Sequence, residues 1–259
     1  MMDFVIFSNL RGTMLDYGKY TFNESKESLD LAKKKEVPIV LCTSKTKEET
    51  ELYRKKIGNK DPFIVENGGA IFVPLKYFSY KFKAKRSPGY MIIELNKDFM
   101  KIKKYIKDLK KKFSIETFDE MAPALIGKML DVPPQQAAYA KKRKYSYAFK
   151  VSDKDEDEVL KLLRKKKWNY YHENDIFYVT GKASKKDAVK NLNSMFKRKK
   201  RGTKTMGIGC CETDFEMLKN VDFPFLVQKK NSKFASDSFN KVKGKGPIGW
   251  SHVVKQMLM

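Results

Sequence analysis

VIFSNLRGTMLDY, residues 5–17, is a short apolar run followed by a tight glycine turn. Phe4 to Phe7 has the length and composition of a strand that is buried on both faces of a parallel sheet. Polar chemistry is expected in the loop that follows, because ligands of such sheets bind beyond the carboxyl ends of the strands. Asn9 and Arg11 precede Gly12 in this loop, so it offers an amide and a cation rather than two carboxylates.

The N-terminal third of the chain alternates predicted strands with predicted helices. After the first strand, the pattern predicts helices over residues 22–35 and 46–57 and strands over residues 38–42 and 63–65. Strands that are joined by helices through short connections open a doubly wound α/β fold with a parallel sheet. The same alternation returns near the C-terminus.

The middle of the chain has a different pattern, which predicts an inserted domain. Between residues 85 and 182, strands and amphipathic helices alternate with polar edges, as in a small α+β domain. We therefore expect a core domain formed by residues 1–84 and 183–259, and an inserted α+β cap domain formed by residues 85–182.

The composition gives the chain a strong positive charge. Lys and Arg number 55 against 31 Asp and Glu, which is a formal net charge of +24. Such a field attracts polyanions, either nucleic acid or acidic protein surfaces, but the Lys-rich surfaces of a heat-adapted proteome give the same composition. No run reaches the roughly 20 apolar residues of a membrane-spanning helix, and no leader precedes the first strand, so we expect a cytoplasmic protein.

The three cysteines, Cys42, Cys210 and Cys211, lack the spacing of a disulfide framework or a zinc site and are expected to be reduced. The strands that carry Cys42 and Cys210 should end near each other. This leaves a redox pair open, although two buried small hydrophobes are favoured. His172 and His252 have no metal-ligand spacing.

Several motifs in a fixed order carry a resemblance that runs nearly end to end. The segments are NLRGT (9–13), TSKT (43–46), PFIVENGGAIFVP (62–74), GCCETD (209–214) and GPIGW (246–250). In this order they resemble the haloacid dehalogenase (HAD) superfamily of phosphohydrolases, in particular the mannosyl-3-phosphoglycerate phosphatases. The resemblance implies a HAD-like doubly wound core with a cap domain inserted after the third strand.

The first motif departs from the family pattern DxDGT at both catalytic positions. In the family the first Asp attacks phosphorus and binds Mg²⁺, and the second acts as acid and base. Asn9 and Arg11 stand at these positions. An amide has no anionic oxygen for an aspartyl-phosphate and is a poorer ligand for Mg²⁺. Arg stays protonated, so it cannot act as a general base. The chain therefore lacks both catalytic groups of the Mg²⁺-dependent phosphatase activity that the family resemblance implies.

The fourth motif, GDxxND in the family, is degenerate as well. Cys210 replaces the first metal-binding Asp and Thr213 replaces the Asn, whereas Asp214 is retained. A neutral thiol is a poor ligand for a hard cation, so neither a metal nor another cofactor is expected. By the same resemblance, Thr43 supplies the hydroxyl of the second motif and Lys185 the lysine that offsets phosphate charge.

The cap motif has changed too. The family's substrate-facing segment RxxSEPF matches residues 143–149, in which Tyr147 and Ala148 replace Glu and Pro. The resemblance implies that Arg143, Ser146 and Tyr147 face the substrate.

The combined substitutions favour a pseudophosphatase that binds an anionic ligand or partner without cleaving it. Vestigial catalytic positions are Asn9, Arg11, Thr43, Lys185, Cys210 and Asp214. In this hypothesis Arg11 takes the electrostatic place of Mg²⁺ and holds a phosphate, a sulfate or an acidic side chain. The other predicted ligand-binding residues are Thr13, Thr43, Ser44 and Lys185. A competing interpretation is that Arg11 pairs with Asp16 or Asp214 and that the pocket is filled.

Two further functions stay open at this point. One is a basic scaffold or nucleic-acid-associated protein on a HAD frame, for which Lys clusters lie beside Tyr105, Phe113, Trp168, Tyr170 and Tyr171. At their helix and strand spacing, these aromatic residues are more typical of a core. The other is an active phosphomonoester hydrolase that uses Mg²⁺ and a rearranged carboxylate, namely Glu212, Asp214 or Asp16.

Overall fold

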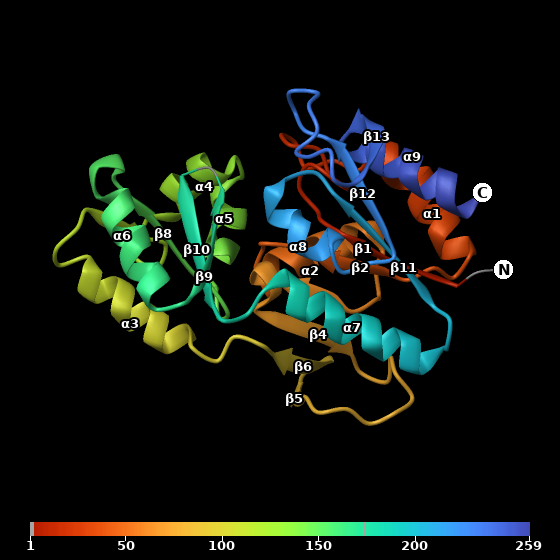
Figure 1. Cartoon of the computed structure of the whole chain (residues 1–259), viewed down its shortest axis with the longest axis horizontal. Helices are drawn as coiled ribbons and strands as arrows, with labels where there is room; N and C mark the ends of the chain where they lie inside the picture. Colours follow the sequence, from red (N-terminus) through yellow and green to blue (C-terminus); the bar gives the residue numbers. More distant parts are fainter. Residues whose placement is uncertain (1–2, 174) are drawn as a thin grey trace.

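A nine-stranded sheet forms the larger of two units in the computed structural model, which describes residues 3–173 and 175–259 (Figure 1). The strand order is β13-β12-β11-β1-β2-β3-β4-β6-β5. The strands from β13 to β3 are parallel, whereas β4, β6 and β5 continue the sheet in antiparallel pairing. Their bounds are β1 (Phe4–Ser8), β2 (Ile39–Cys42), β3 (Phe63–Val65), β4 (Ala70–Pro74), β5 (Lys85–Ser87), β6 (Tyr90–Glu94), β11 (Lys204–Gly209), β12 (Phe223–Gln228) and β13 (Asn240–Lys245).

Helices cover both faces of this sheet, as the doubly wound prediction requires. In β1, Ile6 packs in the apolar layer with α1, α2 and α9, whereas Val5 and Phe7 pack in the layer with α7 and α8. This alternation follows from the two-residue period of a strand. The helix bounds are α1 (Lys26–Lys34), α2 (Lys47–Ile57), α7 (Lys185–Lys199), α8 (Phe215–Leu218) and α9 (Pro247–Leu258).

The smaller unit is the predicted α+β cap, a four-stranded antiparallel sheet in the order β7-β8-β10-β9. One face packs on α3 and α6, and the other packs on α4 and α5, which lie beside the core unit in Figure 1. The bounds are α3 (Phe99–Leu109), β7 (Ile115–Thr117), α4 (Pro123–Leu130), α5 (Pro134–Ala140), β8 (Tyr147–Val151), α6 (Asp153–Lys165), β9 (Asn169–Glu173) and β10 (Ile176–Gly181).

The predicted start of the cap at residue 85 is wrong. Strands β5 and β6 pair with each other, and β6 pairs with β4, so residues 85–94 extend the core sheet. Their short amphipathic pattern shows that they are strands but not which sheet they join. The chain leaves the core sheet after Glu94, and the last cap strand ends at Gly181.

The buried carboxylate of Glu66 joins the core to the cap. It accepts hydrogen bonds from the backbone N–H groups of Lys144, Tyr145 and Ser146 at 3.1, 3.0 and 2.7 Å, and from Ser146 Oγ at 2.9 Å. Asn96 adds a second link, because its Nδ2 donates to Tyr145 O at 2.7 Å. Burial raises the pKa of Glu66, against the opposing effect of Arg143 and these donors. One side chain thus fixes the start of β8.

Several lysines of α3 are paired with carboxylates, and the aromatic residues near the Lys clusters pack against the apolar layers of the cap. Lys103 and Lys107 of α3 pair with Asp119, and Lys110 pairs with Glu120. The five aromatic residues considered as a stacking platform pack into the two apolar layers of the cap instead. Within the described residues, no helix is long and apolar enough to cross a membrane.

The Glu66 link predicts a large loss of stability on truncation. Glu66→Ala leaves three buried N–H groups without an acceptor, so we expect the free energy of unfolding to fall by about 3 kcal/mol or more. Urea unfolding measures this fall. Glu116→Ala, at an exposed position of β7, is the matched control and should change stability by less than about 0.5 kcal/mol. Equal effects of the two substitutions would contradict the assigned role of Glu66.

Candidate functional site

A cavity of about 580 Å³ lies where the loops after β1, β2 and β11 face the cap. The carboxyl ends of these adjacent parallel strands meet at one edge of the sheet, which is where ligands of doubly wound folds bind. The cap contributes Asp131, Arg143, Glu173 and Tyr178 to the opposite wall. The first, second and fourth motifs therefore meet at this cavity.

A buried ion pair between Lys185 and Asp214 forms the base of this site. Lys185 Nζ lies 2.9 Å from Asp214 Oδ1, and the two side chains are 1% and 0% exposed. Burial alone would lower the pKa of Lys185, but the charge of Asp214 raises it above its ordinary value, so the lysine stays charged. The neighbouring Lys186 is exposed, so Lys185 is the lysine that enters the site.

The other carboxylate oxygen of Asp214 holds the two loops around it. Oδ2 accepts the backbone N–H of Cys210 at 2.9 Å and that of Cys211 at 3.4 Å, and Asn9 Nδ2 donates to it at 3.3 Å. Asn9 therefore turns its amide nitrogen, not an oxygen ligand, toward the retained carboxylate.

The residues at this place do not fit the Mg²⁺ ion that the family implies. Mg²⁺ requires oxygen ligands in near-octahedral geometry. Here the amide of Asn9 and the thiol of Cys210 stand where the family has two carboxylates, so Asp214 is the one carboxylate left at these three positions. The residues present therefore do not support an Mg²⁺-dependent step of a phosphatase reaction at this site.

Arg11 forms neither of the two pairs that the competing interpretation required. Its Nη1 lies 3.6 Å from Glu173 Oε1 of the cap, and its guanidinium lies over the Tyr20 ring at 5.6 Å. The carboxylate of Asp16 instead accepts hydrogen bonds from residues 18–21 of its own loop. The cation on Asp214 is Lys185, so Arg11 does not take the electrostatic place of Mg²⁺ there.

The loop after β2 lines the cavity with three successive side chains. Thr43 and Ser44 lie there as predicted, and Ser44 Oγ is 3.5 Å from Glu173 Oε2. Lys45, which sequence reasoning missed, is buried between Glu49 and the Tyr20 ring. Thr13, predicted to bind a ligand, is fully buried and is not among the lining residues.

The cap segment 143–147 reaches the cavity only through Arg143. Its guanidinium donates to Ser44 O at 3.1 Å and to Ser146 Oγ at 2.8 Å, and it lies over the Tyr178 ring. The prediction for Tyr147 is wrong, because strand alternation places its ring in the outer layer, where its hydroxyl donates to Asp119. Ser146 is buried behind Arg143.

The remaining candidates have structural roles. Cys42 and Cys210 pack in different apolar layers, one on each face of the sheet, which disfavours a redox pair. Glu212 pairs with Lys229 at 3.2 Å, and its side chain is 62% exposed. Glu173 and Tyr20 were missed, because no local pattern indicates that β9 and the first loop meet.

The buried ion pair predicts strong coupling between its two members. Lys185→Met leaves the charge of Asp214 uncompensated, so we expect a loss of about 3–5 kcal/mol in the free energy of unfolding. Adding Asp214→Asn to the Lys185→Met variant should lower the free energy of unfolding much less than Asp214→Asn does in the native chain. A double-mutant cycle of urea unfolding curves measures the coupling, and additive effects would contradict it.

Known proteins resemble this chain over most of its length. Residues 6–236 match the model of the haloacid dehalogenase-like hydrolase family. A glucosyl-3-phosphoglycerate/mannosyl-3-phosphoglycerate phosphatase from Methanococcoides burtonii is 33% identical over 99% of this chain and 98% of its own length. A mannosyl-3-phosphoglycerate phosphatase from Pyrococcus furiosus is 32% identical over 86% of this chain and 90% of its own length.

Solved structures share the fold at low identity. A Thermoplasma acidophilum protein matches with a TM-score of 0.72 and 16% identity over 100% of both chains. A haloacid dehalogenase-like hydrolase from B. subtilis matches with a TM-score of 0.70 and 16% identity over 98% of both chains. This chain belongs to the haloacid dehalogenase-like hydrolase family and is related to the glucosyl- and mannosyl-3-phosphoglycerate phosphatases.

Proposed function

We propose that this chain binds a phosphorylated sugar acid of the kind named for its relatives and does not hydrolyse it. The observation that carries the proposal is the state of the first loop. Asn9 donates to Asp214, and Arg11 pairs with the cap, so neither side chain supplies a nucleophilic or basic oxygen to the cavity. An acyl-phosphate route needs a carboxylate at the first of these positions.

The cavity has the size and charge for such a ligand. Its volume of about 580 Å³ lies within the range of small-molecule sites. Arg11 and Arg143 lie on opposite walls, and each has a buried Nε without a hydrogen-bond partner among the described residues. Arg forms bidentate bonds with phosphate and carboxylate groups, and a phosphoglycerate glycoside carries both.

Asp16, Asp214 and Glu212, the three carboxylates predicted as substitutes, do not replace the missing groups. Asp16 is bound within its own loop, Asp214 is neutralised by Lys185, and Glu212 lies at the rim beside Lys229. A general base has to reach the attacking water with a free oxygen. The three carboxylates that sequence reasoning considered are therefore all committed to other contacts.

Binding and turnover are measured separately. Calorimetric titration of the untagged chain with mannosyl-3-phosphoglycerate and with glucosyl-3-phosphoglycerate should give a micromolar dissociation constant. Arg11→Ala should weaken binding about tenfold or more, because it removes a charged hydrogen-bond donor. Arg86→Ala, an exposed position on β5 away from the cavity, is the control and should bind like the native chain.

Phosphate release in the presence of Mg²⁺ tests the loss of hydrolysis. We expect no release by the native chain above that of Arg11→Ala, on the two sugar phosphates or on an aryl phosphate. The double variant Asn9→Asp with Arg11→Asp, and the triple variant that also carries Cys210→Asp, test whether restoring the lost carboxylates restores turnover. Native turnover above the Arg11→Ala level would overturn the proposal, as would the absence of any binding.

An active phosphatase with a rearranged site is the second candidate. The observation that favours it is the full-length identity to relatives that are named as phosphatases. In this structure the added carboxylate at the cavity would be Glu173, which lies beside Arg11. If the native chain releases phosphate, Glu173→Gln should abolish that activity, whereas an unchanged rate would exclude Glu173 as the rearranged carboxylate.

Glu173 has a different predicted effect in the non-hydrolysing protein. It competes with a ligand anion for Arg11, across a partly exposed contact of 3.6 Å. Since such a pair contributes at most about 1 kcal/mol, Glu173→Gln should tighten binding of the sugar phosphate up to about fivefold. The same titration measures this change, and weaker binding by the variant would contradict the competition.

A further inference from the structure

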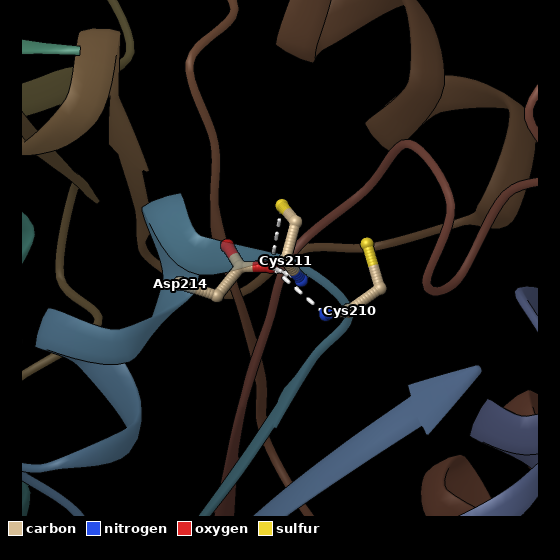
Figure 2. A group of neighbouring side chains, drawn as sticks. All are labelled: Cys210, Cys211 and Asp214. Atoms are coloured by element: carbon tan, nitrogen blue, oxygen red, sulfur yellow. Dashed lines mark hydrogen bonds between the residues drawn. The ribbon is translucent and has the colours of Figure 1, made fainter. Parts of the chain in front are cut away.

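Two thiols and a carboxylate meet at the carboxyl end of β11. The ligand atoms of Cys210, Cys211 and Asp214 all lie within 4.8 Å of one another. Figure 2 shows both sulfur atoms on the same side of the loop, with the Asp214 carboxylate next to Cys211. Both cysteines line the cavity, whereas Asp214 lies beneath them at 0% exposure.

One of the three separations already suits a tetrahedral ion, and the other two are at most 4.8 Å. Zinc binds thiolate sulfur at about 2.3 Å and carboxylate oxygen at about 2.0–2.2 Å, so neighbouring ligand atoms are roughly 3.5 Å apart. Cys211 Sγ and Asp214 Oδ2 are 3.4 Å apart. The sequence spacing of the cysteines argued against zinc. The fold supplies the third donor, because the turn Glu212–Asp214 brings the carboxylate back to the loop.

The chemistry of the donors selects the metal. Thiolates prefer thiophilic cations such as Zn²⁺ and Cd²⁺ and bind Mg²⁺ poorly. We propose that Cys210, Cys211 and Asp214 bind a single thiophilic divalent cation at the base of the cavity. The site differs in metal class from the Mg²⁺ site that the family resemblance implies, and it does not depend on the proposed sugar-phosphate ligand.

The surrounding charges balance such an ion. When the ion binds, the two thiols release their protons to solvent, which leaves two thiolates and the carboxylate. The cation and the ammonium group of Lys185 compensate these three negative charges. Lys185 contacts Oδ1 of Asp214, so the ion approaches Oδ2. The Asn9 Nδ2 contact with that oxygen is long, at 3.3 Å, and rotation of the amide presents its oxygen to the ion instead.

Metal titration of the reduced, untagged chain tests this site. Zn²⁺ affinity is measured by competition with a chromogenic chelator, and Cd²⁺ binding by its ultraviolet sulfur-to-metal charge-transfer band. We expect one ion per chain and the Cd²⁺ charge-transfer band. Excess Mg²⁺ should not displace Zn²⁺ from the protein. The double variant Cys210→Ser with Cys211→Ser should lose the band and at least about 100-fold in Zn²⁺ affinity, because losing even an outer partner costs roughly 10- to 100-fold.

Cys42→Ala is the matched control. Cys42 is a thiol in the same sheet and is fully buried away from the cavity lining, so its loss should leave affinity and band unchanged. Circular dichroism checks that both variants are folded. Equal Zn²⁺ affinity in the native chain and the double variant would overturn the proposal, as would a Cd²⁺ complex without the charge-transfer band. Neither result requires a phosphatase assay, so failure here is separate from failure of the proposed function.

Discussion

The buried ion pair between Lys185 and Asp214 is the interaction on which the site depends. Asp214 receives an ammonium group on one oxygen and two backbone N–H groups of the β11 loop on the other. Removing either charge leaves the other buried without compensation, which costs far more than the pair itself contributes. This constraint explains why these two family positions persist. Asn9 and Arg11 have no such dependence, because Asn9 only donates to the carboxylate and Arg11 lies in a part-exposed contact.

The net charge of +24 attracts an anion into the cavity less than its size suggests, because most cations of the cavity wall are already paired. Most cations on its wall face a carboxylate partner: Arg11 faces Glu173, Lys45 faces Glu49, and Lys229 faces Glu212. A ligand anion therefore exchanges one ion pair for another rather than entering an uncompensated field. Exchange at the two partly exposed pairs of Arg11 and Lys229 costs little, whereas displacing the buried Lys45 or Lys185 costs much. Selectivity then rests on the arginine side chains of the two walls.

The sequence predicted the parts of the fold whose signals are local. Apolar runs located the parallel strands, and the order of strands and helices indicated the doubly wound core. Lys185 enters the site from the first turn of α7, after Ser184 caps the helix. Features that depend on distant segments were not predictable. The pairing of β6 with β4 and the placement of Glu173 beside Arg11 are set by tertiary contacts that leave no periodic trace.

Two missed features did have local signals. Pro123 and Pro134 stand at the first positions of α4 and α5, a common place for proline in helices, and the apolar residues behind them repeat at helical spacing. Tyr147, Ala148 and Phe149 are successive residues of β8, so Tyr147 faces the same apolar layer as Phe149 and the side opposite to Ala148. The family motif outweighed this alternation in the prediction, although alternation is the stronger physical constraint.

Contacts between the core and the cap differ in strength around the cavity. On one side, Glu66 binds the backbone before β8, and the hydroxyl of Tyr20 donates to Leu130 O at 2.9 Å. On the other side, β9 touches the core through the partly exposed pair of Arg11 and Glu173, and the hydroxyl of Tyr171 donates to Glu216 of α8 at 2.6 Å. Buried hydrogen bonds to the main chain cost more to break than an exposed ion pair. The Glu66 side is therefore the more firmly held edge of the contact between the core and the cap.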